Sequence, residues 1–251
     1  DPYLNPMMIY PAIHYSMGGL WVDYNLMTTI PGLYAIGECN FSDHGANRLG
    51  ASALMQGLAD GYFVLPYTIG DYLAHDIQTP KIKTNTPEFD AAEKNVTDHL
   101  RRLYDIKGTK SPDHFHKMLG HIMWDYIGMA REAEGLKKAI KLIAELKEEF
   151  YKDLRVTGEF TAMNNELEKA GRVADFIDIA HLMALDALNR NESCGGHFRL
   201  ESVTEEGEAK RDDEHYQYVS VWEYKGDNKE PELHKEALVF ENIQVAQRSY
   251  K

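Results

Sequence analysis

The stretch HGANRLGASAL, residues 44–54, decides the fold of this protein. Its first half is polar and compact, and it places Arg48 among small neighbours. A planar guanidinium in such a setting suits two-point recognition of a carboxylate. The alternative is that Arg48 lies over the core or pairs with Asp43.

The segment that follows, residues 52–66, has helical spacing and few charges, and it predicts a buried helix. A helix that opens near Ser52 directs its free N–H groups toward an anion. The alternative is an ordinary capped helix without a ligand.

A short apolar run, residues 33–36, lies between Pro31-Gly32 and Gly37, and these turn signals favour a buried strand. In nucleotide-binding α/β folds, a strand that ends in glycine and an acid lets a ligand approach the backbone while the acid binds a ribose hydroxyl. Gly37-Glu38 fits that pattern. The alternative is a tight turn with a surface glutamate.

Upstream of this run stands HYSMGG, residues 14–19. His14 can present a ring donor to a carboxylate, with a glycine turn behind it. A lone histidine is more often structural or solvated, and a pair of glycines by itself indicates only a turn.

The amino-acid composition limits which classes of function are possible. The 251 residues are 43% apolar, enough for a core, and the net charge of -13 argues against a nucleic-acid binder. Cys39 and Cys194 form no CxxC motif and no disulfide framework, which fits a reducing compartment. No apolar run approaches the roughly 20 residues that span a bilayer. The chain opens without Met at Asp1, in what reads as the middle of a domain, so we expect a piece of a longer protein.

Charge and periodicity divide the chain into residues 1–66, 67–190 and 191–251. In the middle part, helix starts at residues 86–88 and 111–113, an apolar stripe over 136–150, and a helix capped by Asn165 predict antiparallel neighbours in a small bundle.

The last part predicts a half-buried strand over residues 216–224, a turn over 225–228 and a partner strand over 238–240. Three histidines at positions 114, 116 and 121 suggest a metal, but their spacing does not align them on one helix face. We therefore expect no metal.

Taken together, HYSMGG, IPGLYAIGE (residues 30–38) and HGANRLGASAL, in this order and spacing, resemble the flavoprotein subunits of succinate dehydrogenase and fumarate reductase. The segment ALNRNESCGGHFR, residues 187–199, resembles the R-x-E-S-x-G-x-H segment of that family, and the acidic residues after Arg211 match its continuation. The resemblance covers essentially the whole chain.

The resemblance implies a mixed α and β fold. Residues 1–66 are expected to form the C-terminal part of an FAD-binding α/β domain. Residues 67–190 are expected to form an antiparallel three-helix, spectrin-repeat-like bundle, and residues 191–251 a small tail of strands and loops.

The resemblance also implies site residues. His14 and Arg48 match the ligands of the substrate carboxylates. Glu38, after Gly37, matches the acid that binds the FAD ribose. Ala53 and Leu54 match the pair whose backbone faces the flavin pyrimidine ring.

Two positions depart from the family's pattern. Ala53 stands where relatives often carry serine, which a backbone contact tolerates. Cys194 stands where relatives often carry arginine, and we expect a buried, inert thiol.

The implied activity is interconversion of succinate and fumarate by hydride transfer to FAD, with electrons passed to an iron–sulfur subunit and quinone. A cytochrome b membrane anchor is the other implied partner, which places the protein peripherally at the cytoplasmic face of the inner membrane. The arginine that transfers the proton is expected upstream, so no catalytic residue is assigned and the fragment alone is expected to be inactive.

Two alternatives stay open. L-aspartate oxidase shares HGANR-type motifs, although its typical continuation is NRMASNSL where this chain reads NRLGASAL. The fragment could also serve only as a structural and interaction module that braces the flavin domain.

Overall fold

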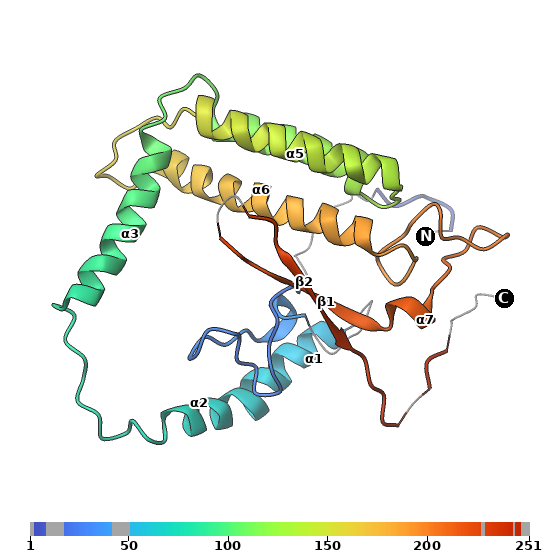
Figure 1. Cartoon of the computed structure of the whole chain (residues 1–251), viewed down its shortest axis with the longest axis horizontal. Coiled ribbons are helices and arrows are strands. Elements are labelled where there is room, and N and C mark those ends of the chain that lie inside the picture. Colours follow the sequence, from blue (N-terminus) through green and yellow to red (C-terminus); the bar gives the residue numbers. More distant parts are fainter. Residues whose placement is uncertain (1–2, 9–17, 42–50, 227–228, 243, 247–251) are drawn as a thin grey trace. The chain divides into compact units, whose positions relative to one another are not determined.

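The computed structural model describes residues 3–8, 18–41, 51–226, 229–242 and 244–246. The chain divides into two compact units, residues 1–80 and 81–251. Helices dominate, and the regular sheet of the described residues has two antiparallel strands (Figure 1). The mixed α and β class is therefore confirmed. The three-helix bundle, the end of an FAD-binding domain and the boundaries near residues 66 and 190 stay predictions.

The first unit contains a long helical stretch. It consists of α1 (Ser52–Ala59), the π-helical segment η2 (Asp60–Val64) and α2 (Leu65–Leu73). Pro66 lies just after the π-helical segment, where the wider turn relieves the clash between the proline ring and the preceding turn. The helix therefore continues through the residue at which the sequence predicts its end.

This helix is not buried as predicted. Leu54 is 73% exposed, and Tyr62 and Phe63 are each 74% exposed. Its apolar side chains have too few neighbours within the first unit to be covered.

The run at residues 33–36 forms a β-bridge rather than a strand, with Tyr34 opposite Met27. Gly32 and Gly37 flank it with φ of 81° and 68°, and these left-handed residues confine the extended conformation to four residues. Ala35 is buried, as expected for part of the run.

The second unit is built from five helices among its described residues. They are α3 (Pro87–Tyr104), α4 (Pro112–Ile122) with its π-helical continuation η3 (Met123–Ile127), α5 (Ala133–Asp153), α6 (Asn165–Asn189) and the short α7 (Asp213–Tyr216). The starts of α3 and α4 are confirmed, and the Ser111 hydroxyl accepts a hydrogen bond from the His114 amide at 3.3 Å.

Helices α5 and α6 lie side by side, and α4 packs against both (Figure 1). The fully buried rings of Phe115 and Phe150 meet edge to face at 5.2 Å in the core of this unit. Alanines line the buried side of α6, which lets the neighbouring helices approach closely. Among the described residues, no helix is both long and apolar enough to cross a bilayer.

The sheet is a hairpin of β1 (Tyr218–Glu223) and β2 (Glu232–Ala237). The predicted partner strand at residues 238–240 is wrong, because the connection is longer than the predicted four-residue turn and pairing begins at Glu232. The Trp222 indole donates to Asp186 on α6 at 2.9 Å and so ties the hairpin to that helix.

The cap of α6 is Asn164, and not Asn165 as the sequence predicted. The Asn164 Oδ1 atom accepts from the amides of Glu166 at 3.0 Å and Leu167 at 3.1 Å. Its Nδ2 atom donates to the carbonyl of Thr157 at 2.8 Å, which fixes the loop before the helix.

We therefore expect Asn164→Ala to lower the free energy of unfolding by about 1–2 kcal/mol, since both the cap and the loop bond are lost. The measurement is urea unfolding followed by circular dichroism. Asn165→Ala is the matched control, because its exposed side chain makes no recorded bond, and it should change stability by less than about 0.5 kcal/mol. An equal loss in both variants would contradict the assignment of the cap.

Candidate functional site

The six predicted site residues fall in the first unit, and the structure describes four of them. Gly37, Glu38, Ala53 and Leu54 are described, whereas His14 and Arg48 lie outside the described residues. The substrate ligands therefore stay predictions.

The Gly37-Glu38 turn has the backbone that its glycine predicts. Gly37 has φ of 68°, a left-handed conformation that a residue with a Cβ atom rarely adopts. It opens the single 3₁₀ turn η1 (Gly37–Cys39), in which Glu38 is 7% exposed. The glutamate is thus a buried carboxylate held at a sharp turn, and not a surface residue.

The helix that follows holds this turn in place from both sides. The Asp60 carboxylate accepts from the Gly37 amide at 2.8 Å, and the Gln56 amide donates to the Gly37 carbonyl at 3.4 Å. Gln56 also donates to Asn40 Oδ1 at 3.3 Å, and Asn40 donates to the carbonyl of Ala35 at 3.1 Å.

These supporting residues were missed by the sequence reasoning. The available signal was the spacing of Gln56 and Asp60, which are two polar residues four apart in an otherwise apolar helix. Both are buried, so their polar atoms need internal partners, and the Gly37 backbone supplies one for each.

The segment from Gly18 lies beside the same turn. The Gly18 amide donates to the carbonyl of Glu38, and the Leu20 amide donates to the carbonyl of Cys39 at 3.1 Å. A Cβ atom on Gly18 would lie 1.8 Å from the Asn40 carbonyl oxygen, so only glycine fits. The HYSMGG motif therefore ends against Gly37-Glu38.

Among the described residues, no side chain caps the N-terminus of α1. Its N-cap residue, Ala51, has φ of 65°, and the first helical bond runs from the Met55 amide to the Ala51 carbonyl at 3.4 Å. Ala53 is half-buried in this first turn and Leu54 is exposed. An uncapped helix start is suited to an anionic oxygen.

These features fit a flavin nucleotide. A left-handed glycine permits close approach to the backbone, a buried acid can accept from ribose hydroxyls, and an uncapped first turn can donate to a flavin carbonyl edge. Three features carry this fit, namely Gly37, Glu38 and the first turn of α1.

The second unit contains a different buried polar cluster, centred on Arg199. This arginine is 2% exposed, and its Nη1 atom donates to the carbonyls of Ala187, Leu188 and Arg190 at 2.9, 3.4 and 3.3 Å. These carbonyls end α6, so the cation caps the negative end of the helix.

The partner of Arg199 is Glu201, which caps another helix. Arg199 Nε donates to Glu201 Oε2 at 3.1 Å, and Glu201 Oε1 accepts from the Ala133 amide at the start of α5 at 2.6 Å. Burial raises the pKa of Glu201, but the bonds from Arg199 and Ala133 outweigh it and lower the pKa to about 2. One ion pair therefore joins the end of α6 to the start of α5.

His197 lies in the same cluster as a neutral ring. Its Nε2 atom is 2.8 Å from the Arg190 carbonyl and must donate, so Nδ1 accepts from Arg131 Nη1 at 2.7 Å. Burial lowers the pKa of His197; the bond to the Arg190 carbonyl opposes this, and the charges of Arg131 and Arg199 lower it further. Asp186 has a weaker, opposing effect.

The rest of the ESCGGH segment anchors the tail. Glu192 is 3% exposed and accepts from Arg190 at 2.9 Å and from the Asp212 amide at 2.9 Å. Ser193 is fully buried and exchanges two hydrogen bonds with the Arg199 backbone. Burial raises the pKa of the Cys194 thiol, which disfavours the reactive thiolate.

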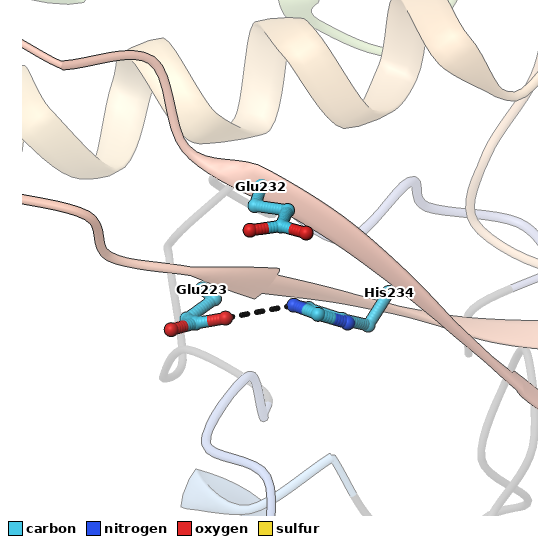
Figure 2. Close-up of side chains that lie close together, drawn as sticks. All are labelled: Glu223, Glu232 and His234. Carbon is cyan, nitrogen blue, oxygen red and sulfur yellow. Dashed lines mark hydrogen bonds and ion pairs between the residues drawn. The ribbon is translucent and has the colours of Figure 1, made fainter.

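Glu223, Glu232 and His234 converge at the end of the hairpin, where their ligand atoms lie within 4.8 Å of one another (Figure 2). Glu223 and Glu232 are directly opposite each other, an arrangement of like charges that destabilises a sheet unless it is neutralised. Lys225 pairs with both carboxylates, at 3.2 and 2.9 Å, and His234 bonds Glu223 at 2.8 Å. All three are exposed and already ion-paired, so we assign no metal here.

Comparisons with known proteins identify related families. Residues 116–250 match the family described as fumarate reductase flavoprotein C-term, and residues 1–54 match an FAD binding domain. The chain is 35% identical over 199 residues to the succinate dehydrogenase flavoprotein subunit of Bacillus subtilis, covering 79% of this chain and 33% of the relative. It is 32% identical over 251 residues to the fumarate reductase flavoprotein subunit of Haemophilus influenzae, covering 100% and 40%.

An L-aspartate oxidase of Synechocystis is 29% identical over 216 residues, covering 80% of this chain and 36% of the relative. Among solved structures, E. coli quinol fumarate reductase superposes with a TM-score of 0.79 at 28% identity, covering 98% of this chain and 40% of that one. The chain thus spans between 33% and 40% of the length of these proteins.

The neutral His197 predicts a pH dependence of stability. Because the pKa is lower in the folded protein than the ordinary 6.5, the unfolded chain takes up the proton more readily. Stability should be fully present above pH 6.5 and fall as the pH drops toward the folded pKa. His197→Gln keeps a donor and an acceptor but cannot titrate, so it should flatten this part of the profile, measured by urea unfolding between about pH 7.5 and 5.

Glu201→Gln is the control within the same cluster. The pKa of the Glu201 carboxyl shifts from the ordinary 4.5 to about 2, so this group titrates below pH 5. The Glu201→Gln substitution should therefore not change the slope of stability against pH above pH 5. A His197→Gln profile parallel to that of the unsubstituted protein would contradict the neutral assignment.

Proposed function

The chain belongs to the fumarate reductase flavoprotein family, and from that premise we propose that it is part of the flavoprotein subunit of an enzyme that interconverts succinate and fumarate. The observation that carries the proposal is the order of two matches, an FAD binding domain over residues 1–54 and the C-terminal family over residues 116–250. Two relatives above 30% identity that are described above are flavoprotein subunits of succinate dehydrogenase and fumarate reductase.

In this proposal Glu38 accepts hydrogen bonds from the ribose hydroxyls of FAD. Gly37 gives the cofactor room beside the backbone, and Asp60 and Gln56 hold that backbone rigid. The first turn of α1, with Ala53 and Leu54, donates backbone N–H groups to the pyrimidine edge. Bound FAD supplies the two-electron acceptor or donor for the reaction.

His14 and Arg48 are proposed to bind the carboxylates of the substrate. A charged guanidinium and a ring N–H fix the dicarboxylate and stabilise charge that develops on it. Neither residue is assigned the proton transfer, so the chain by itself is proposed to be inactive. A longer flavoprotein that contains this chain would supply the group that transfers the proton.

An iron–sulfur subunit and a cytochrome b membrane anchor are the proposed partners. Electrons from the flavin need an acceptor, and no described helix of this chain is long and apolar enough to cross the membrane. Attachment through partner subunits at the cytoplasmic face of the inner membrane follows from this proposal.

Two other functions are supported by specific observations. L-aspartate oxidases match the chain, although at the lower identity of 29%. A bracing role is supported by the Arg199–Glu201 pair, which joins the end of α6 to the start of α5. The bracing role is compatible with the enzyme proposal, because one subunit can contain both the flavin-binding part and the part that braces it.

The first test is flavin reduction in a flavoprotein that contains this chain. Anaerobic mixing with succinate should bleach the flavin absorbance, and Arg48→Ala should slow the bleaching by roughly 100-fold, since positioning is lost. Arg172→Ala is the matched control, because within the described ranges this exposed arginine of α6 pairs only with Glu168, and the variant should bleach normally. Bleaching by L-aspartate instead of succinate would favour the oxidase.

The second test concerns the cofactor. Glu38→Gln keeps the size of the side chain but removes its charge, so FAD affinity should fall about tenfold, as measured by flavin fluorescence during titration of the apoprotein. Glu134→Gln, an exposed change on α5, is the control and should leave affinity unchanged. Equal affinity of the Glu38→Gln protein would remove Glu38 from the site.

A further inference from the structure

The second unit contains a hollow of about 460 Å³. Its lining residues are different from those of the polar cluster around Arg199. Its lining is Lys107, Arg155, Val156, Thr157 and Gly158. Two loops form it, one after α3 and the other between α5 and α6. It combines two cationic side chains with a hydroxyl and a glycine, and it contains no acid.

The walls of the hollow are held together by backbone bonds. The Gly108 amide donates to the Leu154 carbonyl at 2.8 Å, and the Arg155 amide donates to the Lys110 carbonyl at 2.7 Å. A Cβ atom on Gly108 would lie 2.1 Å from the Asp153 backbone, so the loops are in direct contact. The site is therefore built from fixed loops.

An aromatic ring lies against one of the two cations, Lys107. Lys107 Nζ lies 3.5 Å from the centre of the Tyr104 ring, and the Tyr104 hydroxyl donates to the Gly158 carbonyl at 2.8 Å on the opposite wall. Tyr104 packs on Phe160, and Arg101 lies over the Phe160 ring at 4.3 Å. Cation–π contacts hold a charge without neutralising it.

The positive charge here is not balanced by carboxylates. Among the described residues, neither Lys107 nor Arg155 makes an ion pair, although Asp105 and Glu159 are close in sequence. Some other cations of this unit do pair with acids, as Lys147 does with Asp178 and Arg172 with Glu168.

Lys107 also has an unusual backbone. Its φ is 55°, in the left-handed region that residues with long side chains rarely occupy. Its side chain lies over the Tyr104 ring. Strained residues of this kind concentrate at ligand sites.

From these features we infer that the hollow binds a phosphate group, either free phosphate or the phosphate of a small ester. The Arg155 guanidinium provides a two-point contact to phosphate oxygens, the Lys107 ammonium provides a point charge, and the Thr157 hydroxyl donates the remaining bond. Gly158, with φ of 85°, completes the lining of the hollow. The site involves neither FAD nor succinate, so it stands or fails separately from the proposed function.

The test uses the 251-residue chain in phosphate-free buffer of low ionic strength, where charge interactions are least screened. Inorganic phosphate and glycerol 3-phosphate are titrated separately by calorimetry, and the amide resonances of residues 156–158 are followed by NMR. We expect saturable binding with shifts at these amides. Binding of inorganic phosphate alone identifies free phosphate, and tighter binding of the ester identifies a phosphoester ligand.

Two double variants distinguish a specific phosphate site from nonspecific electrostatic attraction of phosphate to the protein. The double variant Lys107→Gln, Arg155→Gln should weaken binding at least tenfold, while Lys117→Gln and Lys83→Gln together remove the same charge from exposed positions and should leave it unchanged. All four side chains are exposed, and unchanged thermal unfolding verifies the fold. Absence of binding by both compounds, or equal weakening in the two double variants, would overturn the proposal.

Discussion

A buried guanidinium connects two helix ends in the second unit. Arg199 is 2% exposed, and a charge so far from water costs several kcal/mol unless it is fully bonded. The last carbonyls of α6 and the Glu201 carboxylate satisfy it, and Glu201 in turn satisfies the start of α5. This arrangement ties the start of α5 and the ESCGGH segment to the end of α6.

The first unit uses the same device on a smaller scale. Buried side chains of a helix, Asp60 and Gln56, bind the backbone of a turn and leave the neighbouring Glu38 in a fixed position. In the first unit the Gly37-Glu38 turn is held by residues outside the family motif, whereas in the second unit Arg190, Ser193 and Arg199 of the motif hold one another. A site built this way is preorganised, because the supporting bonds form before any ligand arrives.

Local signals in the sequence predicted local structure. Serine and proline at positions 111 and 112 predicted the start of α4, and glycine at position 37 predicted a turn. Features that depend on distant partners could not be predicted this way. Asn164 caps α6 instead of Asn165 because its amide also reaches the Thr157 carbonyl, and β2 starts at Glu232 because its register follows β1. The roles of Gln56, Asp60 and Arg199 likewise depend on backbone atoms far along the chain.

The helix from Ser52 to Leu73 presents tyrosine, phenylalanine and leucine side chains outward, and it has no polar stripe to separate them. A surface of this kind is what cellular chaperones recognise and hold. Production of the segment by itself would therefore depend on the folding machinery of the host. Its solubility would reflect how quickly another surface covers the helix, rather than the stability of the helix itself.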